Sequence, residues 1–228
     1  MEDKKIITLG DFKVMSIVED TTEIPKGVSM IKAPEYWNKG DRGRGVVIAV
    51  IDSGCDCDHV DLKDRIIGKY NFTSDDGGNP ENVTDYIGHG THVAGIIGAS
   101  QNGKGVVGVA PLCSLLILKA LNKNGQGTEE DVAKAINYAV SKKVNIISMS
   151  LGRTEETPLI YQAIKKAVSN NILVVCEAGN EGYSNGDTEV NANKANIQRN
   201  TDRLNDQITK EAEDYAELKV RITFLNEL

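Results

Sequence analysis

Two residues with chemically active side chains stand in settings that suit acid–base chemistry. His89 lies in the glycine-rich stretch from Gly88 to Gly95, and the apolar run Val93–Ile97 predicts a buried helix with His89 on its first turn. An imidazole held at the rim of a core can act as a general base, although a structural histidine in a turn is the alternative. Asp52 follows the β-branched run 46–51, which is typical of a buried parallel strand. Open α/β sheets bind ligands at the carboxyl ends of such strands.

The segments that must position these side chains alternate between strands and helices. Thr128, with Asp131 three residues later, forms a capping-box variant that predicts a helix start. Thr157 and Pro158 predict an N-cap and a first-turn proline for another helix. The alternation indicates an α/β protein with a mostly parallel sheet. The expected strands are 46–51, 114–120, 145–150 and 173–176, and the expected helices are 33–37, 132–142 and 158–169.

Composition and charge limit the classes of protein that fit. The chain has 228 residues, 40% of them hydrophobic and 26% charged, which is ordinary for a globular protein. A net charge of -7 argues against nucleic acid or an anionic membrane surface as the main partner. No apolar run is long enough to span a bilayer, and residues 1–8 offer no signal-peptide core. We therefore expect a cytoplasmic protein.

The four cysteines are expected to be reduced and mostly buried thiols, as is usual in that compartment. They are Cys55, Cys57, Cys113 and Cys176. Cys55, Cys57 and His59 could also be read as a metal-binding cluster. Their spacing matches none of the common zinc patterns, so the metal interpretation is the weaker one.

Four short blocks carry a resemblance to a known family. Val50–Gly54, His89–Gly95, Ser150–Gly152 and Ala178–Gly182 resemble consecutive blocks of the subtilisin-like serine proteases. The order Asp then His is that of subtilisin. Ile31–Trp37, the acidic balance and the absence of a signal peptide are most similar to the Bacillus-type intracellular subtilisins. The resemblance covers about residues 24–190, and the His-Gly-Thr-His-Val-Ala-Gly block is its most specific part.

The resemblance implies a role for each matching residue. His89 would be the general base, Asp52 would orient its imidazole, and Asn180 would donate a hydrogen bond to the tetrahedral oxyanion. A protease must hold its substrate as an extended strand, and the segment at Ser150 would be the edge that pairs with it. Glu177 stands where a small residue usually lines the specificity pocket, so a carboxylate there could favour a basic substrate side chain. The implied substrate-binding residues are Ser150, Leu151, Gly152, Glu177 and Gly179.

A structural calcium ion is also implied by the resemblance. Its ligands would be Asp61, Ser100, Asn102, Lys104 and Val106. Hard oxygen ligands, some of them backbone carbonyls, suit this cation. The alternative for residues 100–106 is an ordinary glycine-rich turn.

The sequence departs from the family pattern at the nucleophile. The family's serine lies in a Gly-Thr-Ser-Met-Ala-x-Pro block, which does not occur in these 228 residues. Ser53, Ser148, Ser150 and Ser184 are all in positions that argue against a nucleophilic role. The intracellular members also carry a Leu-Ile-Pro-Tyr inhibitory motif, and residues 1–23 show no match to it. We therefore expect no self-inhibition by that motif.

The expected architecture is a truncated subtilisin-like three-layer α/β fold followed by an amphipathic helix. Apolar residues from Leu204 to Leu225 recur at helical spacing, and this stripe could fold back or support self-association. The expected divisions are an N-terminal extension (1–30), a peptidase-like portion (31–190), a linker (191–200) and a helical tail (201–228).

Three functional hypotheses follow. The first is a serine endopeptidase by lineage, acting on polypeptides but inactive alone because its nucleophile is missing. The second is a non-catalytic peptide-binding or regulatory protein, or half of a split protease completed by a C-terminal fragment. The third is an aspartic protease built on Asp52-Ser53-Gly54, which would need a second carboxylate sharing a proton.

Overall fold

The structure is a computed structural model that describes residues 6–9, 22–40, 42–152 and 157–177. These residues belong to the first of two units, 1–180 and 181–228. The predicted linker (191–200) and helical tail (201–228) lie outside the described residues. Both therefore stay predictions.

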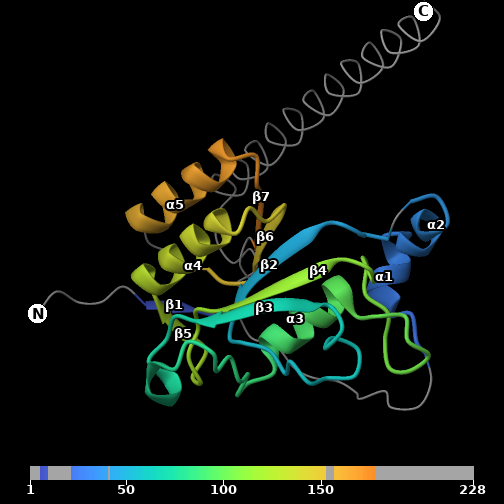
Figure 1. Ribbon diagram of the computed structural model, residues 1–228, viewed down its shortest axis with the longest axis horizontal. Coiled ribbons are helices and arrows are strands. Elements are labelled where there is room, and N and C mark those ends of the chain that lie inside the picture. The colour runs from blue at the N-terminus through green and yellow to red at the C-terminus, as the bar shows by residue number, and fades with distance from the viewer. Residues whose placement is uncertain (1–5, 10–21, 41, 153–156, 178–228) are drawn as a thin grey trace, which may run out of the picture. The chain divides into compact units, whose positions relative to one another are not determined.

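A five-stranded parallel sheet forms the centre of the described unit (Figure 1). The strand order is β3-β4-β2-β6-β7, and every neighbouring pair is parallel. The four strands expected from apolar runs are all present, whereas β3 was not predicted. Its residues alternate between half-buried and exposed at the sheet edge, so it lacks a continuous apolar run. The strands are β2 (Val47–Asp52), β3 (Ile66–Asn71), β4 (Ser114–Lys119), β6 (Ile146–Met149) and β7 (Leu173–Cys176).

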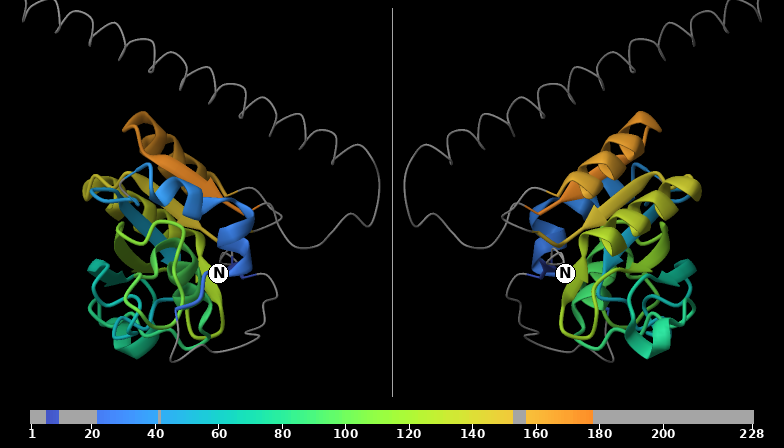
Figure 2. Two further views of the ribbon diagram at one scale, coloured as in Figure 1. Left: turned by 90° about the vertical axis from the view of Figure 1, so that its right-hand side faces the viewer. Right: turned by 90° about the vertical axis from the view of Figure 1, so that its left-hand side faces the viewer.

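Helices cover both faces of the sheet and complete the expected three layers. Along β2, Ile48 and Val50 pack into the core cluster that contains Ala94 of α3 (His89–Gly98). The alternating residues Ala49 and Ile51 pack into the opposite cluster, with α4 (Glu129–Ser141) and α5 (Pro158–Ser169). Successive side chains of a strand point to opposite faces, so a strand buried on both sides is apolar throughout. Figures 1 and 2 show α4 and α5 side by side.

The helix caps and the helix burial predicted from the sequence are confirmed only in part. The Thr128 hydroxyl accepts a hydrogen bond from the Asp131 backbone N–H at 3.1 Å, which confirms the predicted cap of α4. The predicted N-cap position of α5 is confirmed, with Thr157 at the N-cap and Pro158 in the first turn, but the Thr157 side chain accepts no hydrogen bond from the helix. The prediction that the run 93–97 is buried all round is wrong. Ile96 is 46% exposed, since α3 packs on the sheet through its other face.

Shorter elements frame the sheet. The predicted helix α2 (Ala33–Trp37) is present with proline in its first turn, and α1 (Lys26–Met30) precedes it. Strand β1 (Ile6–Thr8) pairs antiparallel with β5 (Gln126–Thr128), and neither strand was predicted. Ile7 is 1% exposed and joins the core, so part of the expected extension packs on the domain. A short 3-10 helix, Asp75–Gly78, follows β3.

Within the described ranges, no helix has both the length and the apolar character needed to cross a membrane.

Candidate active site

The carboxyl end of β2 brings Asp52 and His89 together. Nδ1 of His89 lies 2.7 Å from Oδ1 of Asp52, and the aspartate is only 1% exposed. Asp52 is the last residue of the central strand, and His89 is the first residue of α3. Gly90 makes this approach possible, because a Cβ there would overlap with the Gly54 carbonyl oxygen and crowd Asp52. The two residues that the sequence singled out are therefore in contact, and their catalytic roles stay predictions.

The Asp52 carboxylate adjusts the basicity of His89. Burial alone lowers the pKa of His89, but the hydrogen bond and charge of Asp52 raise it above its ordinary value. The charges of Asp85 and Glu177 act in the same direction. An imidazole that donates from Nδ1 to a carboxylate has Nε2 as its basic nitrogen, and the resulting imidazolium is stabilised. The pair therefore has the geometry of an oriented general base.

Asp85 is hydrogen-bonded to the segments that carry Asp52 and His89, and so fixes their relative position. Its carboxylate accepts hydrogen bonds from Ser53 Oγ (2.9 Å), Thr91 Oγ1 (2.7 Å) and the Gly88 backbone N–H (2.9 Å). Ser53 Oγ in turn accepts from the Gly90 N–H at 3.0 Å. Burial raises the pKa of Asp85, but these hydrogen bonds more than offset it and hold that pKa below its usual value. The network joins the residue after Asp52 to the first turn of α3.

Lys119, the last residue of β4, contacts the segment that follows the carboxyl end of β2. Its side chain is fully buried, donates to the Ser53 carbonyl oxygen at 2.6 Å and lies 3.3 Å from the Asp75 carboxylate. A buried ammonium is tolerated only where such partners replace water. Neither Lys119 nor Asp85 was singled out from the sequence. The lysine that closes the apolar run Leu115–Leu118 was the signal available for the first of them.

The predicted substrate edge lies beside an extended segment of the chain itself. Gly152 and Thr8 form an antiparallel bridge, with the Gly152 N–H donating to the Thr8 carbonyl oxygen at 3.4 Å. Strand β1 therefore pairs with β5 and also reaches the Ser150–Gly152 segment. Glu177 is close to the same segment, because a Cβ on Gly152 would lie 3.2 Å from its Oε1. The structure thus brings Gly152 and Glu177 together beside an extended segment, while the Leu151 side chain is buried in the core.

Several predicted site residues cannot be placed. Asn180, Gly179 and Ser184 lie outside the described residues, so the oxyanion donor stays a prediction. Ser53 is engaged by Asp85 and by the Gly90 N–H, which agrees with its expected structural role. Ser148 lies within β6, and Ser150 follows that strand.

The predicted calcium loop wraps around a buried carboxylate. Asp61 is 2% exposed, and its oxygens accept from Asn102 Nδ2 and from the Val106 N–H, both at 3.0 Å. The Ser100 N–H donates to the Asp61 carbonyl oxygen at 2.8 Å, while the buried Ser100 Oγ has no hydrogen-bond partner among the described residues. Both carboxylate oxygens of Asp61 thus accept N–H hydrogen bonds from within the chain, and calcium binding by this loop stays a prediction. Lys104 donates its N–H to Asn102 Oδ1, which closes the loop.

The cysteines are all free thiols. Among the described residues, no group of three or more His, Cys, Asp or Glu side chains is arranged to hold a metal ion. The metal interpretation of Cys55, Cys57 and His59 therefore gains no support. His59 Nδ1 instead accepts the Asp61 N–H at 3.2 Å.

The parallel sheet, the aspartate at the end of its central strand and the histidine that opens α3 together define a class of protein. Residues 43–209 match the model of the Subtilase family, a peptidase family, and the chain belongs to it. This confirms the resemblance seen in the sequence and the α/β fold that it implied.

Among its relatives, the chain is 55% identical over 178 residues to an intracellular serine protease of Paenibacillus polymyxa. It is 53% identical over 173 residues to the major intracellular serine protease of Bacillus subtilis (strain 168). The two matches cover 78% and 75% of this chain, and 54% of each relative. Subtilisin DY of Bacillus licheniformis is 40% identical over 161 residues, covering 71% of this chain and 57% of that protein. The chain thus spans about half the length of the curated relatives it matches.

Proposed function

We propose that this chain carries the acid–base half of a serine endopeptidase site and binds polypeptide in an extended conformation. The observation that carries the proposal is the 2.7 Å contact between His89 and Asp52 on a subtilase framework. In the proposed reaction, His89 Nε2 takes the proton of a serine hydroxyl as it attacks the peptide carbonyl, and later returns it to the leaving amine. Asp52 keeps the imidazole oriented and stabilises its cationic form.

The nucleophile is proposed to come from outside the 228 residues. No Gly-Thr-Ser-Met-Ala block occurs in the sequence, and the Ser53 hydroxyl is used by the Asp85 network. Without an alcohol to deprotonate, a correctly placed base has no covalent step to assist. The chain alone is therefore expected to be inactive, and a separate C-terminal fragment of subtilase sequence would supply the serine.

Peptide binding is the part of the function that the chain can perform alone. Strand β1 lies extended, pairs with β5 and bridges Gly152, so the backbone of Gly152 pairs with the chain's own N-terminal segment, which a bound peptide would have to displace. This observation also favours the second candidate function, a non-catalytic peptide-binding or regulatory protein. The aspartic-protease alternative loses its basis, because Asp52 pairs with a histidine and the chain is a subtilase.

The preferred peptide would carry a basic side chain beside Glu177. That carboxylate lies near Gly152 and near enough to His89 to influence its pKa. A buried or half-buried carboxylate gains most from a cationic partner, because water screens it poorly. Peptides that differ only in Arg or Leu at one position test this. Equal affinity for the two would remove the proposed selectivity.

Calcium and location complete the proposal. If calcium binds, the oxygens of Asp61, Asn102 and the loop 100–106 would hold it and so fix the loop.

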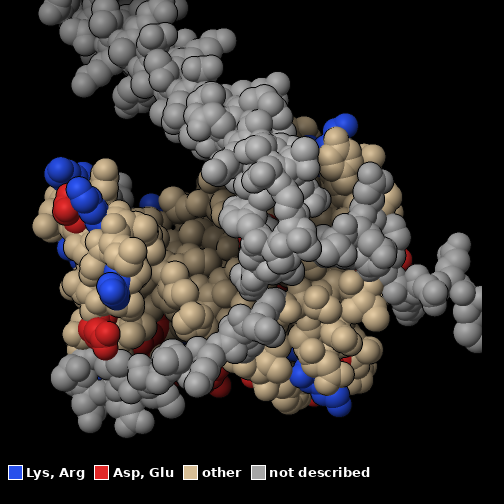
Figure 3. Space-filling model, turned by 180° about the vertical axis from the view of Figure 1, so that it is seen from behind, with Lys and Arg blue, Asp and Glu red and all other residues tan. Residues whose placement is uncertain are grey.

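The names of the relatives from Paenibacillus and Bacillus support an intracellular location for this chain. On the face shown in Figure 3, the basic and acidic side chains of the described residues lie in small separate groups. With the net charge of -7, this supports a polypeptide rather than a nucleic acid as the partner.

A complementation assay tests the proposal. The full chain is assayed on a peptide substrate alone and after mixing with the C-terminal half of the Bacillus subtilis relative, with and without a serine-directed phosphonate. We expect no cleavage by the chain alone and phosphonate-sensitive cleavage by the mixture. His89→Ala should reduce the latter by about 10³-fold or more. Robust phosphonate-sensitive cleavage by this chain alone would show that it has its own nucleophile.

A further inference from the structure

The dithiol formed by Cys55 and Cys57 plays no part in the proposed hydrolysis. Cys57 is partly exposed, whereas Cys55 is 2% exposed and belongs to the core cluster beneath α3. The Cys57 thiol donates a hydrogen bond to the Cys55 carbonyl oxygen at 3.6 Å. One sulfur is therefore accessible and the other is buried directly beside it.

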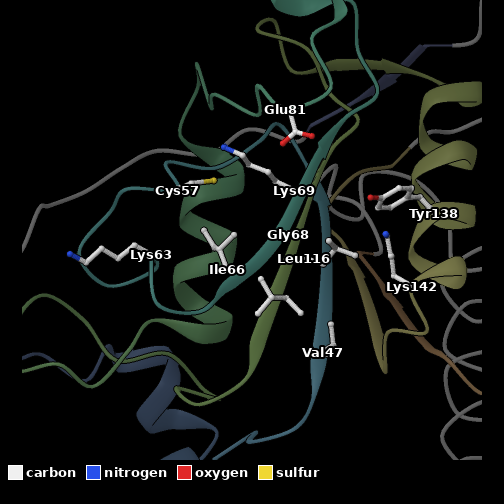
Figure 4. A pocket seen from close by; sticks show the side chains of 11 residues that line it. Val47, Cys57, Lys63, Ile66, Gly68, Lys69, Glu81, Leu116, Tyr138 and Lys142 are labelled. Atoms are coloured by element: carbon white, nitrogen blue, oxygen red, sulfur yellow. The ribbon is translucent and has the colours of Figure 1, made fainter.

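Cys57 lines an open groove of about 620 Å³ along β3. Lys63, Lys69 and Glu81 line the same groove, and Figure 4 shows Lys69 reaching across it towards Cys57. The hydrogen bond from Cys55, followed by the charge of Lys69, lowers the pKa of Cys57 against the effect of burial. A partly exposed thiol next to a cation is the usual setting of a reactive cysteine.

The other thiols are held in their protonated form, so Cys57 is expected to react first with an oxidant. The pKa of Cys55 is raised by the interaction with Cys57 and by burial. Burial raises the pKa of Cys113 to about 11. The pKa of Cys176 is raised by burial and by the charge of Glu177, although the residue is exposed. The chain thus contains an accessible thiol that can serve as an internal control.

We propose that Cys57 is a site of oxidation by hydroperoxides and that Cys55 resolves it to an intramolecular disulfide. Two cysteines separated by one residue have Cα atoms at most about 7 Å apart, which overlaps the range that a disulfide spans. A small oxidant fits because Cys57 lines the groove, whereas Cys55 is not among the residues that line it and is 2% exposed.

The chemistry balances in two steps. The Cys57 thiolate attacks the outer oxygen of ROOH, the O–O bond breaks, and the alkoxide takes a proton to leave as ROH. The sulfur is now a sulfenic acid. The Cys55 thiol then attacks this sulfur, the S–S bond forms, the S–O bond breaks, and hydroxide leaves with the Cys55 proton as water. The two thiols lose two electrons and the peroxide gains them.

The experiment follows thiol chemistry and does not depend on proteolysis. The reduced full chain is treated with hydrogen peroxide, the remaining thiols are alkylated, and the protein is digested and weighed. We expect Cys57 to react at least about tenfold faster than Cys176, and the 55–57 peptide to lose the mass of two hydrogens. In denatured protein the two rates should become equal. Equal rates in the native chain, or oxidation of Cys57 without the link to Cys55, would overturn the proposal.

Matched variants separate the roles. Cys55→Ala should leave Cys57 as a sulfenic acid that dimedone traps, whereas Cys176→Ser should leave the disulfide yield unchanged. Lys69→Met should slow the oxidation of Cys57 by roughly threefold or more, and Lys63→Met, in the same groove, should not. Circular dichroism of each variant confirms that it is folded. A disulfide that still forms in Cys55→Ala would mean that another cysteine resolves Cys57.

Discussion

The centre of the sheet and its β7 edge are organised in opposite ways. At the carboxyl end of β2, polar side chains are buried and bound: Asp52 is 1% exposed and Lys119 is fully buried between Ser53 and Asp75. At β7, apolar side chains are exposed: Leu173 and Val175 are 45% and 48% accessible, and the strand pairs only with β6 among the described residues. The acid–base pair is therefore preorganised by buried polar contacts, whereas the β7 edge leaves two apolar side chains nearly half exposed.

The largest expected effect comes from removing the buried cation. Lys119→Met should lower the free energy of unfolding by about 3 to 5 kcal/mol, because it leaves Asp75 and the Ser53 carbonyl without their partner. Denaturant unfolding measures this. Lys123→Met, in which the replaced side chain is exposed, should change stability by no more than about 0.5 kcal/mol. Similar losses for the two variants would mean that the centre of the sheet does not depend on this network.

Asp52→Asn tests the pair itself. At a pH where His89 is protonated, losing this charged hydrogen bond should cost about 1.5 to 3 kcal/mol. The folded pKa of His89 is raised above its ordinary value of 6.5, so its contribution is fully present below the unfolded pKa. It is lost as pH rises through the raised folded pKa.

The penalty of the Asp52→Asn substitution should therefore shrink as pH rises, and NMR titration should show the pKa of His89 falling in the variant. An unchanged titration of His89 would contradict the assigned contact.

The two helix starts offer a smaller comparison. Thr128→Ala should destabilise by about 1 kcal/mol, because the Thr128 hydroxyl caps α4. Thr157→Ala should cost less, since that side chain makes no cap hydrogen bond to α5. Thermal and denaturant unfolding of the two variants measure the difference. Equal losses of stability in the two variants would mean that Thr157 caps α5 as effectively as Thr128 caps α4.

The smallest effect on stability is expected at the β7 edge of the sheet. Val175→Thr should change the free energy of unfolding by less than about 0.5 kcal/mol, because the side chain is nearly half exposed. Leu118→Ala, at a fully buried position of β4, is the contrasting variant and should cost about 2 to 5 kcal/mol. A large loss at Val175 would show that the β7 edge is covered in solution.

The fold was predictable where burial makes a simple pattern. Strands buried on both faces appear as unbroken apolar runs, as β2 and β4 do. Strands β6 and β7 are also short apolar runs and could be located in the same way, although Leu173 and Val175 of β7 are nearly half exposed. Edge strand β3 and the short pair β1–β5 could not, because half-exposed strands mix polar and apolar residues and their partners are distant in sequence. Thr157 shows the limit for helix caps: a threonine before proline has the right identity, but its side chain makes no cap bond.

The two residues of the acid–base pair could be predicted from the sequence, whereas the residues that hold the pair in place could not. Asp52 and His89 stand in short motifs, and each motif lies at the end of an element that the pattern located. Asp85 and Lys119 act through contacts that only the folded chain creates: 32 residues separate Asp85 from Ser53, and 66 separate Lys119 from the same residue. No local pattern shows such a contact. Ile6–Thr8 shows the same limit, since nothing in that segment indicates a pairing with Gln126–Thr128.

The close packing of Gly90 has a consequence for how sequence variation in this chain should be interpreted. Any amino-acid substitution at that position adds at least a Cβ, which would collide with the Gly54 carbonyl oxygen and crowd Asp52. A library screened only for folded protein, with no demand for catalysis, should therefore be depleted of every substitution at Gly90. Intolerance of substitution next to His89 would then report backbone packing, and such a position is a poor marker of selection for enzymatic activity.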